Sequence, residues 1–332
     1  MPVCPLQFTI ADMSKRRTSQ RGVFVADVIA NDAVCDAHYL LSLAVDSFPA
    51  TRPGQFIQVQ CRPVSDHVSD RPVVWRPGEP PVFKQPELTK KEPMLRRPFS
   101  LAGRREQAGL TVLDVMYRTI GTGTTWLAGV APGDRLSILG PLGNAFEVKS
   151  SKKVAAVIGG GVGIPPMIYL AEALVAEHSQ VIAFCGVQTA RLLPLSISDR
   201  AKIATDCQPA CCVEPFGALA VPSVISTDDG SIGHRGFVNE AFEIWLKKTA
   251  VSPDEIVVYC CGPEAMMRAV AGTCIARGID CQVAMERHMA CGMGTCQSCI
   301  VKVRDEASPC GWSYKLCCSD GPVFDATSIL WQ

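Results

Sequence analysis

The sequence has no excess of charge of either sign. Its 332 residues include 32 lysines and arginines and 32 aspartates and glutamates. No broad electrostatic attraction to nucleic acid or to an anionic membrane is therefore expected. A chain of this length predicts about two domains, with room for a small third.

The sequence also lacks a long, uninterrupted apolar run. Its most weakly charged stretch, residues 154–176, contains three consecutive glycines, a pair of prolines and Glu172, which suit a membrane-spanning helix poorly. Residues 1–20 have no apolar core followed by a small-residue cleavage site, as a secretory signal requires. We therefore expect a soluble, cytoplasmic protein whose residues 1–20 form a poorly ordered extension.

Cysteine, by contrast, is abundant, with 17 in the chain. Cys291, Cys296 and Cys299 have the spacing of plant-type ferredoxins, in which four thiolates hold a [2Fe-2S] cluster. Three ligands on one short loop require tight turns, which Gly292 and Gly294 permit. The fourth ligand must then come from a distant segment.

A zinc site and disulfides are the alternatives for these cysteines. A structural zinc site usually takes two short CxxC pairs, whereas this segment has one, Cys296 and Cys299. The odd number of cysteines, spread through apolar segments of a large chain, indicates a reducing compartment and disfavours disulfides. The spacing therefore favours an iron-sulfur cluster, with Cys310, Cys317 and Cys318 as candidates for the fourth ligand.

Residues 21–149 show the pattern of a β domain. Short β-branched or aromatic runs are separated by Asn, Asp, Pro and Gly, and no long amphipathic helix interrupts them. An antiparallel barrel is the expected closure. Residues 62–96 are instead rich in proline and charge, so we interpret them as a surface insertion in a barrel loop.

From residue 150 to 285 the pattern changes to alternating buried strands and helices. Apolar runs at 154–158, 181–187 and 256–262 predict parallel strands, and residues 281–287 predict a last strand that leads into the cysteine loop. This alternation is typical of a doubly wound sheet. Residues 286–332 then form a small third domain around the cysteines.

The first of these strands ends in a glycine-rich turn, GGGVGIPP, at residues 159–166. Such a turn before a helix suits a pyrophosphate, because glycines let the backbone approach and helix amides meet the negative charge. The motif is not GxGxxG, and a tight strand-to-helix connection explains it equally well.

Cys261, at the tip of the strand 256–262, is the candidate catalytic residue, whereas Cys260 is expected to be a small buried side chain.

Two motifs in the barrel are candidates for binding a diphosphate. Arg97 in RPFS could donate two parallel hydrogen bonds, beside an apolar wall from Phe99 and a small donor, Ser100. Residues 116–127 place glycines and threonines before a short helical stretch. Neither motif is specific alone, since Pro98 also suits an ordinary edge strand.

The order RPFS, glycine-threonine turn, GPLGN, GGGVGIPP and CGPEAMM resembles the ferredoxin reductase superfamily, which pairs an FAD-binding barrel with a nicotinamide-binding domain. With TDDGSIGHRGFV, MACGMGTCQSC and YKLCCSDGPVFDA, residues 22–330 resemble the electron transfer subunits of dihydroorotate dehydrogenase. The long insertion, the amino-terminal extension and the CCGP motif depart from that family.

The resemblance implies three groups of site residues. FAD would contact Arg97, Pro98, Phe99, Ser100, Met116, Tyr117, Arg118, Gly123 and Thr124. NAD would contact Gly159, Gly160, Gly161, Gly163 and Pro165. The cluster ligands would be Cys291, Cys296, Cys299 and Cys318, because the family's last ligand precedes DGPVF by one residue, which leaves Cys317 as a spare thiol.

The resemblance also implies a function. A partner subunit that contains FMN would oxidise dihydroorotate, electrons would pass through the [2Fe-2S] cluster and FAD to NAD+, and two copies of each subunit would assemble. NAD is favoured over NADP because Arg191 and Arg235 are isolated rather than clustered. The alternatives are a flavin subunit of sulfide dehydrogenase or of NADH-dependent ferredoxin:NADP oxidoreductase, and, in another class, a zinc-stabilised binding module.

Overall fold

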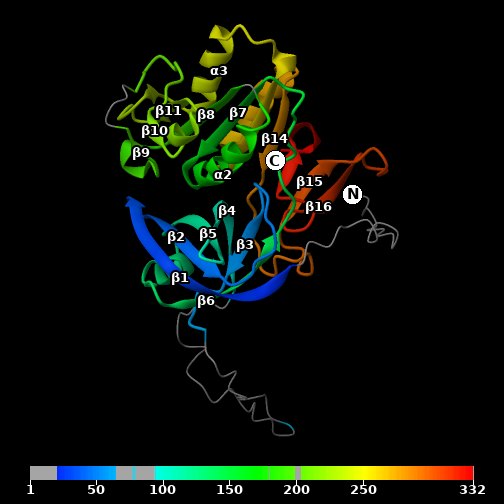
Figure 1. Cartoon of the computed structure of the whole chain (residues 1–332). Helices are drawn as coiled ribbons and strands as arrows, with labels where there is room; N and C mark the ends of the chain where they lie inside the picture. The colour runs from blue at the N-terminus through cyan, green and yellow to red at the C-terminus, as the bar shows by residue number, and fades with distance from the viewer. Residues whose placement is uncertain are drawn as a thin grey trace.

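The computed structural model describes residues 21–64, 95–178, 180–198 and 203–331, together with residues 78 and 93. The predicted extension at 1–20 and most of the predicted insertion at 62–96 lie outside the described residues. Figure 1 shows a β-barrel below a sheet with its helices, and a smaller carboxy-terminal part beside them.

Six strands close into the predicted antiparallel barrel, in the order β1-β2-β5-β4-β3-β6. They are β1 (Gly22–Cys35), β2 (His38–Val45), β3 (Phe56–Val59), β4 (Arg97–Gln107), β5 (Leu110–Arg118) and β6 (Arg135–Leu142), with helix α1 (Thr122–Ala128) between the last two. Because residues alternate between the faces of a strand, Ile57 and Val59 lie in the barrel core while Phe56 packs outside it. Gln58 therefore shares the outer face of β3 with Phe56.

The second domain is built on a seven-stranded sheet in the order β12-β11-β8-β7-β13-β14-β17. All of its pairs are parallel except the pair of β14 and β17. Its strands are β7 (Val154–Gly160), β8 (Gln180–Val187), β11 (Ser223–Thr227), β12 (His234–Arg235), β13 (Ile256–Cys261), β14 (Asp280–Ala284) and β17 (Val323–Asp325). Strands β9 (Ser196–Ile197) and β10 (Val213–Glu214) form a separate pair.

Helices cover both faces of this sheet, as a doubly wound fold requires. Helix α2 (Ile164–Leu174) packs on one face, and α3 (Val238–Lys248) and α4 (Glu264–Arg277) pack on the other. Five 3-10 turns complete the domain and the tail: Gly161–Gly163, Ala190–Leu192, Gly217–Leu219, Pro253–Glu255 and Ala326–Ser328. The prediction of an α/β domain with a parallel sheet is confirmed.

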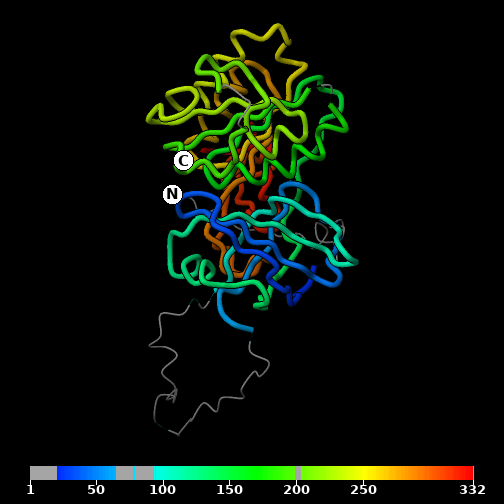
Figure 2. Tube along the Cα trace, turned by 60° about the vertical axis from the view of Figure 1, so that its left-hand side comes forward, coloured from blue at the N-terminus to red at the C-terminus, as the bar shows by residue number. Residues whose placement is uncertain are grey.

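The carboxy-terminal part is joined to both domains. Its hairpin, β15 (Ile300–Arg304) and β16 (Trp312–Leu316), is followed by β17, which returns to become the edge strand of the large sheet. Asn144, just after β6, donates to the carbonyl oxygens of Asp320 and Val323 at 3.0 and 2.8 Å. Figures 1 and 2 show the orange segment after β14 passing beside the barrel.

The two larger domains also contact each other directly. Tyr169 of α2 belongs to the barrel's hydrophobic core, and its hydroxyl lies 2.8 Å from the hydroxyl of Thr51. Asp36, between β1 and β2, forms an ion pair with Arg191, in which Oδ2 lies 2.8 Å from Nε. These contacts join the barrel directly to the sheet domain.

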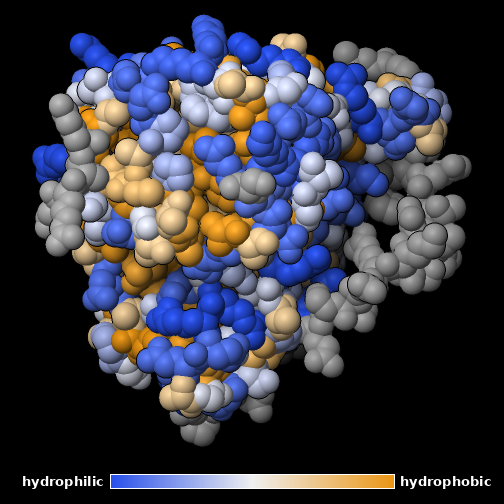
Figure 3. Space-filling view, turned by 45° about the horizontal axis from the view of Figure 1, so that its top comes forward, coloured by the Kyte–Doolittle hydropathy of each residue, from blue (hydrophilic) through white to orange (hydrophobic). Residues whose placement is uncertain are grey.

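From the sequence we did not predict helix α3 or the strands β9, β10, β11, β12, β15, β16 and β17, and the predicted strand at 281–287 ends earlier, at Ala284. In the described part of the chain, no helix has the length and apolar character needed to cross a membrane. Hydrophobic and hydrophilic residues are intermixed on the face shown in Figure 3.

Candidate functional site

The cysteine loop lies between β14 and β15. Gly292 and Gly294 have φ angles of +69° and +92°, so both occupy a conformation that favours glycine. The tight winding points backbone amides at sulfur: the amides of Met293 and Cys296 donate to Cys291 Sγ at 3.4 and 3.3 Å. Amide donors of this kind stabilise thiolates.

The four predicted ligands come together as two pairs. The side chains of Cys291 and Cys296 are hydrogen-bonded to each other. The side chains of Cys299 and Cys318 form a second such pair, and the amide of Cys318 donates to Cys299 Sγ at 3.4 Å. Cys318 also lies within electrostatic range of Cys291. Two thiols for each of two irons is the donor set that a [2Fe-2S] cluster needs.

The two pairs differ in exposure and acidity. Cys296 is exposed, and hydrogen bonds from the Ser298 hydroxyl and from backbone amides lower its pKa to about 6. Cys318 is buried, and burial raises its pKa to about 12. Across the described residues, no three His, Cys, Asp or Glu side chains are arranged around one metal ion. The residues present fit a two-iron cluster through their pairing and their thiolate-favouring amides.

Cys317 lies beside this pairing, since its amide donates to the carbonyl oxygen of Cys299 at 2.8 Å, but its thiol has another partner. Its thiol donates to the carbonyl oxygen of Met285 at 3.0 Å, and the side chain is fully buried. Burial raises the pKa of Cys317 above the usual thiol range. Cys310 is exposed in the loop between β15 and β16, where its sulfur donates to the carbonyl oxygen of Trp312.

The barrel motifs predicted to bind FAD lie together because β4 and β5 are antiparallel neighbours. The beginning of β4 lies beside the end of β5, and α1 follows at once. A Cβ added to Gly123 would lie 3.1 Å from Arg97 Nε, so the guanidinium covers the first turn of α1. Thr124 Oγ1 accepts hydrogen bonds from the amides of Ile120 and Gly121 at 3.0 and 3.2 Å.

Strand alternation divides this set of residues between two faces. Phe99 and Tyr117 point into the barrel core, where their ring centroids are 5.8 Å apart. The hydroxyl of Tyr117 donates to Asn31 Oδ1 at 3.0 Å. These two residues therefore offer backbone atoms to a ligand outside the barrel. The neighbouring residues on the outer face are Pro98, Ser100, Met116 and Arg118.

The glycine turn after β7 is shaped mainly by packing. A Cβ on Gly159 would lie 2.7 Å from Ile164 Cα, one on Gly160 would lie 2.4 Å from Met266 Sδ, and one on Gly163 would lie 2.2 Å from the carbonyl oxygen of Cys261. Gly161 differs, with φ of +53° and nothing within 4 Å of an added Cβ. Gly161 is thus the open point of the turn.

Cys261 ends β13 beside this turn, as predicted. Burial raises the pKa of Cys261 to about 12, and the nearby Glu286 carboxylate contributes to this rise as a smaller cause. Glu286 is solvent-exposed, yet the surrounding protein desolvates it enough to raise its pKa. Pro165 lies in the first turn of α2, where a missing amide costs nothing.

Sequence reasoning missed two polar residues at this site, Glu286 and Gln58. Glu286 had no signal beyond following β14, since its proximity to Cys261 depends on the pairing of β13 with β14. Gln58 is fully buried with both side-chain polar atoms unpartnered. Its position within a strand of otherwise apolar residues was a usable signal.

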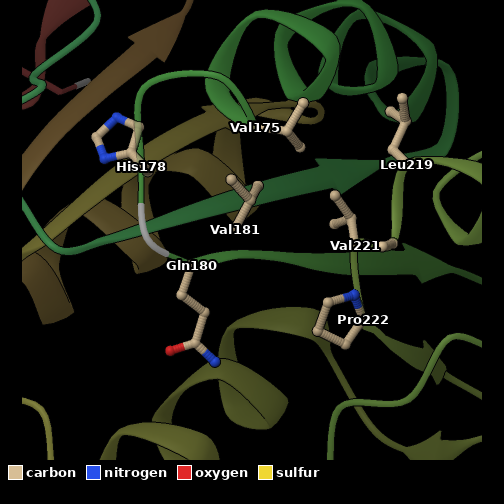
Figure 4. A pocket seen from close by; sticks show the side chains of 8 residues that line it. Val175, His178, Gln180, Val181, Leu219, Val221 and Pro222 are labelled. Carbon is tan, nitrogen blue, oxygen red and sulfur yellow. The ribbon is translucent and has the colours of Figure 1, made fainter.

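The pocket in Figure 4 belongs to another region. Val181 at the beginning of β8 and Val221 and Pro222 just before β11 line it, together with His178. It therefore lies at the amino-terminal edge of the sheet, whereas the glycine turn and Cys261 lie at the opposite edge.

Of the two arginines considered for binding NADP, Arg191 forms an ion pair with Asp36, and Arg235 lies on the edge strand β12.

Two family models match the chain. Residues 286–330 match the iron-sulfur cluster binding domain of dihydroorotate dehydrogenase B, and residues 157–272 match the oxidoreductase NAD-binding domain. Among solved structures, the NADH-dependent reduced ferredoxin-NADP oxidoreductase has a TM-score of 0.66 at 21% identity, over 92% of this chain and 90% of that one. A cytochrome P450 reductase from Amycolatopsis has a TM-score of 0.54 at 21% identity, over 79% of this chain and 68% of that one. Both share the fold.

Curated relatives extend over nearly the whole chain. The dihydroorotate dehydrogenase B (NAD(+)) electron transfer subunit of Desulforamulus reducens is 30% identical over 313 residues, which cover 93% of this chain and 99% of the relative. The corresponding subunit of Geobacillus kaustophilus is 35% identical over 241 residues, which cover 72% of this chain and 81% of the relative. This chain therefore belongs to the family of dihydroorotate dehydrogenase B (NAD(+)) electron transfer subunits.

Proposed function

We propose that this chain is the electron transfer subunit of an NAD-dependent dihydroorotate dehydrogenase in pyrimidine biosynthesis. A partner subunit that contains FMN would oxidise dihydroorotate, and this chain would pass the electrons on to NAD+. The single observation that carries the proposal is the pairing of Cys291 with Cys296 and of Cys299 with Cys318, inside the segment that matches this family's cluster-binding model.

The proposed roles of the chain's residues follow from their positions. The four paired cysteines would hold the [2Fe-2S] cluster. Arg97, beside the first turn of α1, would hold the diphosphate of FAD, and the turn at Gly161 would receive the pyrophosphate of NAD. When bound, the flavin supplies the conversion between the electron pairs of nicotinamide and the single electrons of the cluster.

Cys261 ends β13 beside the glycine turn, and Glu286 lies close to it. The Cys261 thiol is neutral at physiological pH because burial raises its pKa. A neutral, compact side chain at the strand tip can pack against a planar ring without adding charge to it. We therefore propose that Cys261 orients the nicotinamide.

Assembly and location also belong to this proposal. Two copies of this chain would assemble with two catalytic subunits. We also propose a cytoplasmic location, because an odd number of cysteines, 17, spread through apolar segments indicates a reducing compartment.

The proposal is tested by anaerobic purification followed by assays for iron, acid-labile sulfide and FAD. Mixing the protein with the FMN-containing catalytic subunit should give NAD+ reduction that depends on dihydroorotate, and NADH should bleach the flavin faster than NADPH. A colourless protein would contradict the proposal and favour a zinc module. A loaded protein that reduces ferredoxin or polysulfide, but gains no dihydroorotate activity with the catalytic subunit, would favour the alternative oxidoreductases.

A further inference from the structure

Gln58 is an anomaly on strand β3. Its side chain is 0% exposed, and neither Nε2 nor Oε1 has a hydrogen-bond partner. Leaving such an amide unpaired destabilises the folded protein, because the buried group loses its hydrogen bonds to water. Other buried glutamines do not share this condition: Gln55 accepts from the amide of Arg52 at 2.9 Å and donates to the carbonyl of Gly143 at 3.1 Å.

The amide of Gln58 lies against the cysteine loop. A Cβ added to Gly292 would lie 2.6 Å from Cδ, 2.7 Å from Oε1 and 2.8 Å from Nε2 of Gln58. Gly292 directly follows Cys291, and its lack of a side chain is what admits the amide. The residue beside Gly292 is Cys291, whose Sγ accepts hydrogen bonds from the amides of Met293 and Cys296, so sulfur acts as an acceptor in this loop.

Gln58 lies on the outer face of β3, together with Phe56. Phe56, on the same face of β3, packs in the hydrophobic core that contains Cys299, Cys317 and Cys318. The Gln58 side chain is fully buried, and its amide lies against Gly292 of the cysteine loop. Its cross-strand neighbour is Pro98 of the RPFS motif, so the residue connects the barrel motif to the loop.

We propose that the Gln58 side-chain amide donates a hydrogen bond to sulfur of the cluster held by the Cys291 loop, and thereby sets the cluster's reduction potential. This inference rests on the proposed function, because it requires the cluster. Hydrogen bonds to cluster sulfurs stabilise the more negative, reduced state and raise the potential. Gln58 is a positioning and tuning residue rather than a cluster ligand.

Two substitutions test the donor while keeping the size of the side chain. In Gln58→Met the N–H donors are lost and the volume is retained, so the midpoint potential of the cluster, followed by electron paramagnetic resonance, should become more negative. In Gln58→Leu the N–H donors are likewise lost, so the shift should have the same direction and a similar size. Gln55→Met is the matched control: it removes a paired amide from the same strand region and should leave the potential unchanged.

The results separate this inference from the proposed function. A wild-type protein without iron and sulfide would contradict the proposed function. A Gln58→Met protein with full iron and sulfide content and an unchanged potential would overturn the role of Gln58 alone.

A second measurement does not depend on how Gln58 variants fold. Glutamine labelled with nitrogen-15 in its side-chain amide is incorporated into a Gln297→Asn background, because Gln297 lies inside the cysteine loop and would also be detected. Asn tolerates the positive φ of 56° at this position. Hyperfine spectroscopy of the reduced cluster should show a nitrogen-15 coupling, and its absence would overturn the inference.

Discussion

Cys317 and Cys318 are neighbours in the sequence with opposite surroundings. Cys318 pairs with Cys299, whereas the Cys317 thiol donates to the Met285 carbonyl oxygen at 3.0 Å. We therefore expect Cys318→Ser to lose most of the cluster and Cys317→Ser to keep it, as measured by iron, acid-labile sulfide and visible absorbance. FAD content should stay unchanged in both variants, which controls for folding. Cluster loss in Cys317→Ser alone would show that the other neighbour is the ligand.

His38 is the residue whose ionisation should affect stability near neutral pH. Its side chain is buried, and Nδ1 lies 2.7 Å from the carbonyl oxygen of Asp36. Burial lowers the pKa of His38, an effect to which Arg118 adds. The unfolded chain then binds a proton more readily than the folded chain, so stability is full above about pH 6.5 and falls as the pH drops through the folded-state pKa.

The substitution His38→Gln should remove this dependence. Gln can still donate to the Asp36 carbonyl but does not titrate. Denaturant unfolding at pH 8 and pH 5 should show a smaller loss of unfolding free energy on acidification than in the wild type, by about 1.4 kcal/mol for each unit by which the pKa is lowered. An equal acid-dependent loss in both proteins would mean that His38 is not the group responsible.

At the scale of the element, the turn from β7 to α2 depends on close packing against the end of β13. A Cβ on Gly163 would lie 2.2 Å from the carbonyl oxygen of Cys261, and main-chain atoms cannot rotate away. Gly163→Ala should therefore lower the free energy of unfolding by at least the ~1–3 kcal/mol typical of overpacked sites, as measured with urea.

Gly272 of α4 provides the matched control for that substitution. An added Cβ there meets nothing within 4 Å. Gly272→Ala should stabilise the protein by about 0.5–1 kcal/mol, because alanine is favoured over glycine inside a helix. If Gly163→Ala were as stable as the wild type, the two strand-end turns would not be packed as described.

At the scale of the whole molecule, Asn144 joins the barrel to the cluster-binding part. It donates to Asp320 and Val323 carbonyl oxygens and accepts from the Val323 amide at 2.9 Å. Asn144→Ala should lower the unfolding free energy by about 1–3 kcal/mol, because backbone groups lose their partners. It should also speed the loss of cluster absorbance in the presence of a chelator, since the loop then opens more often.

Asn31 makes a comparable set of bonds wholly within the barrel. It donates to the Leu127 and Val130 carbonyl oxygens at 2.9 Å each and accepts from Tyr117 at 3.0 Å. Asn31→Ala should cost a similar free energy without changing the rate of cluster loss. Equal rates of cluster loss in the two variants would argue against a specific role for Asn144.

Much of this molecule follows from short-range patterns in the sequence. The buried runs at 154–158 and 181–187 became parallel strands, and the prolines after the glycine turn became the first turn of α2. The spacing of Cys291, Cys296 and Cys299 indicated one compact loop. These features are local, because side-chain alternation, proline geometry and cysteine spacing act over a few residues.

The tertiary structure alone decided which side chains meet. The strand β17 is three residues long and exists only because β14 offers an open edge. The direction of the Cys317 thiol depends on the Met285 carbonyl, 32 residues away, and the inward direction of Tyr117 depends on Asn31. Hydrogen bonds between distant segments determine these orientations, and no local pattern carries that information.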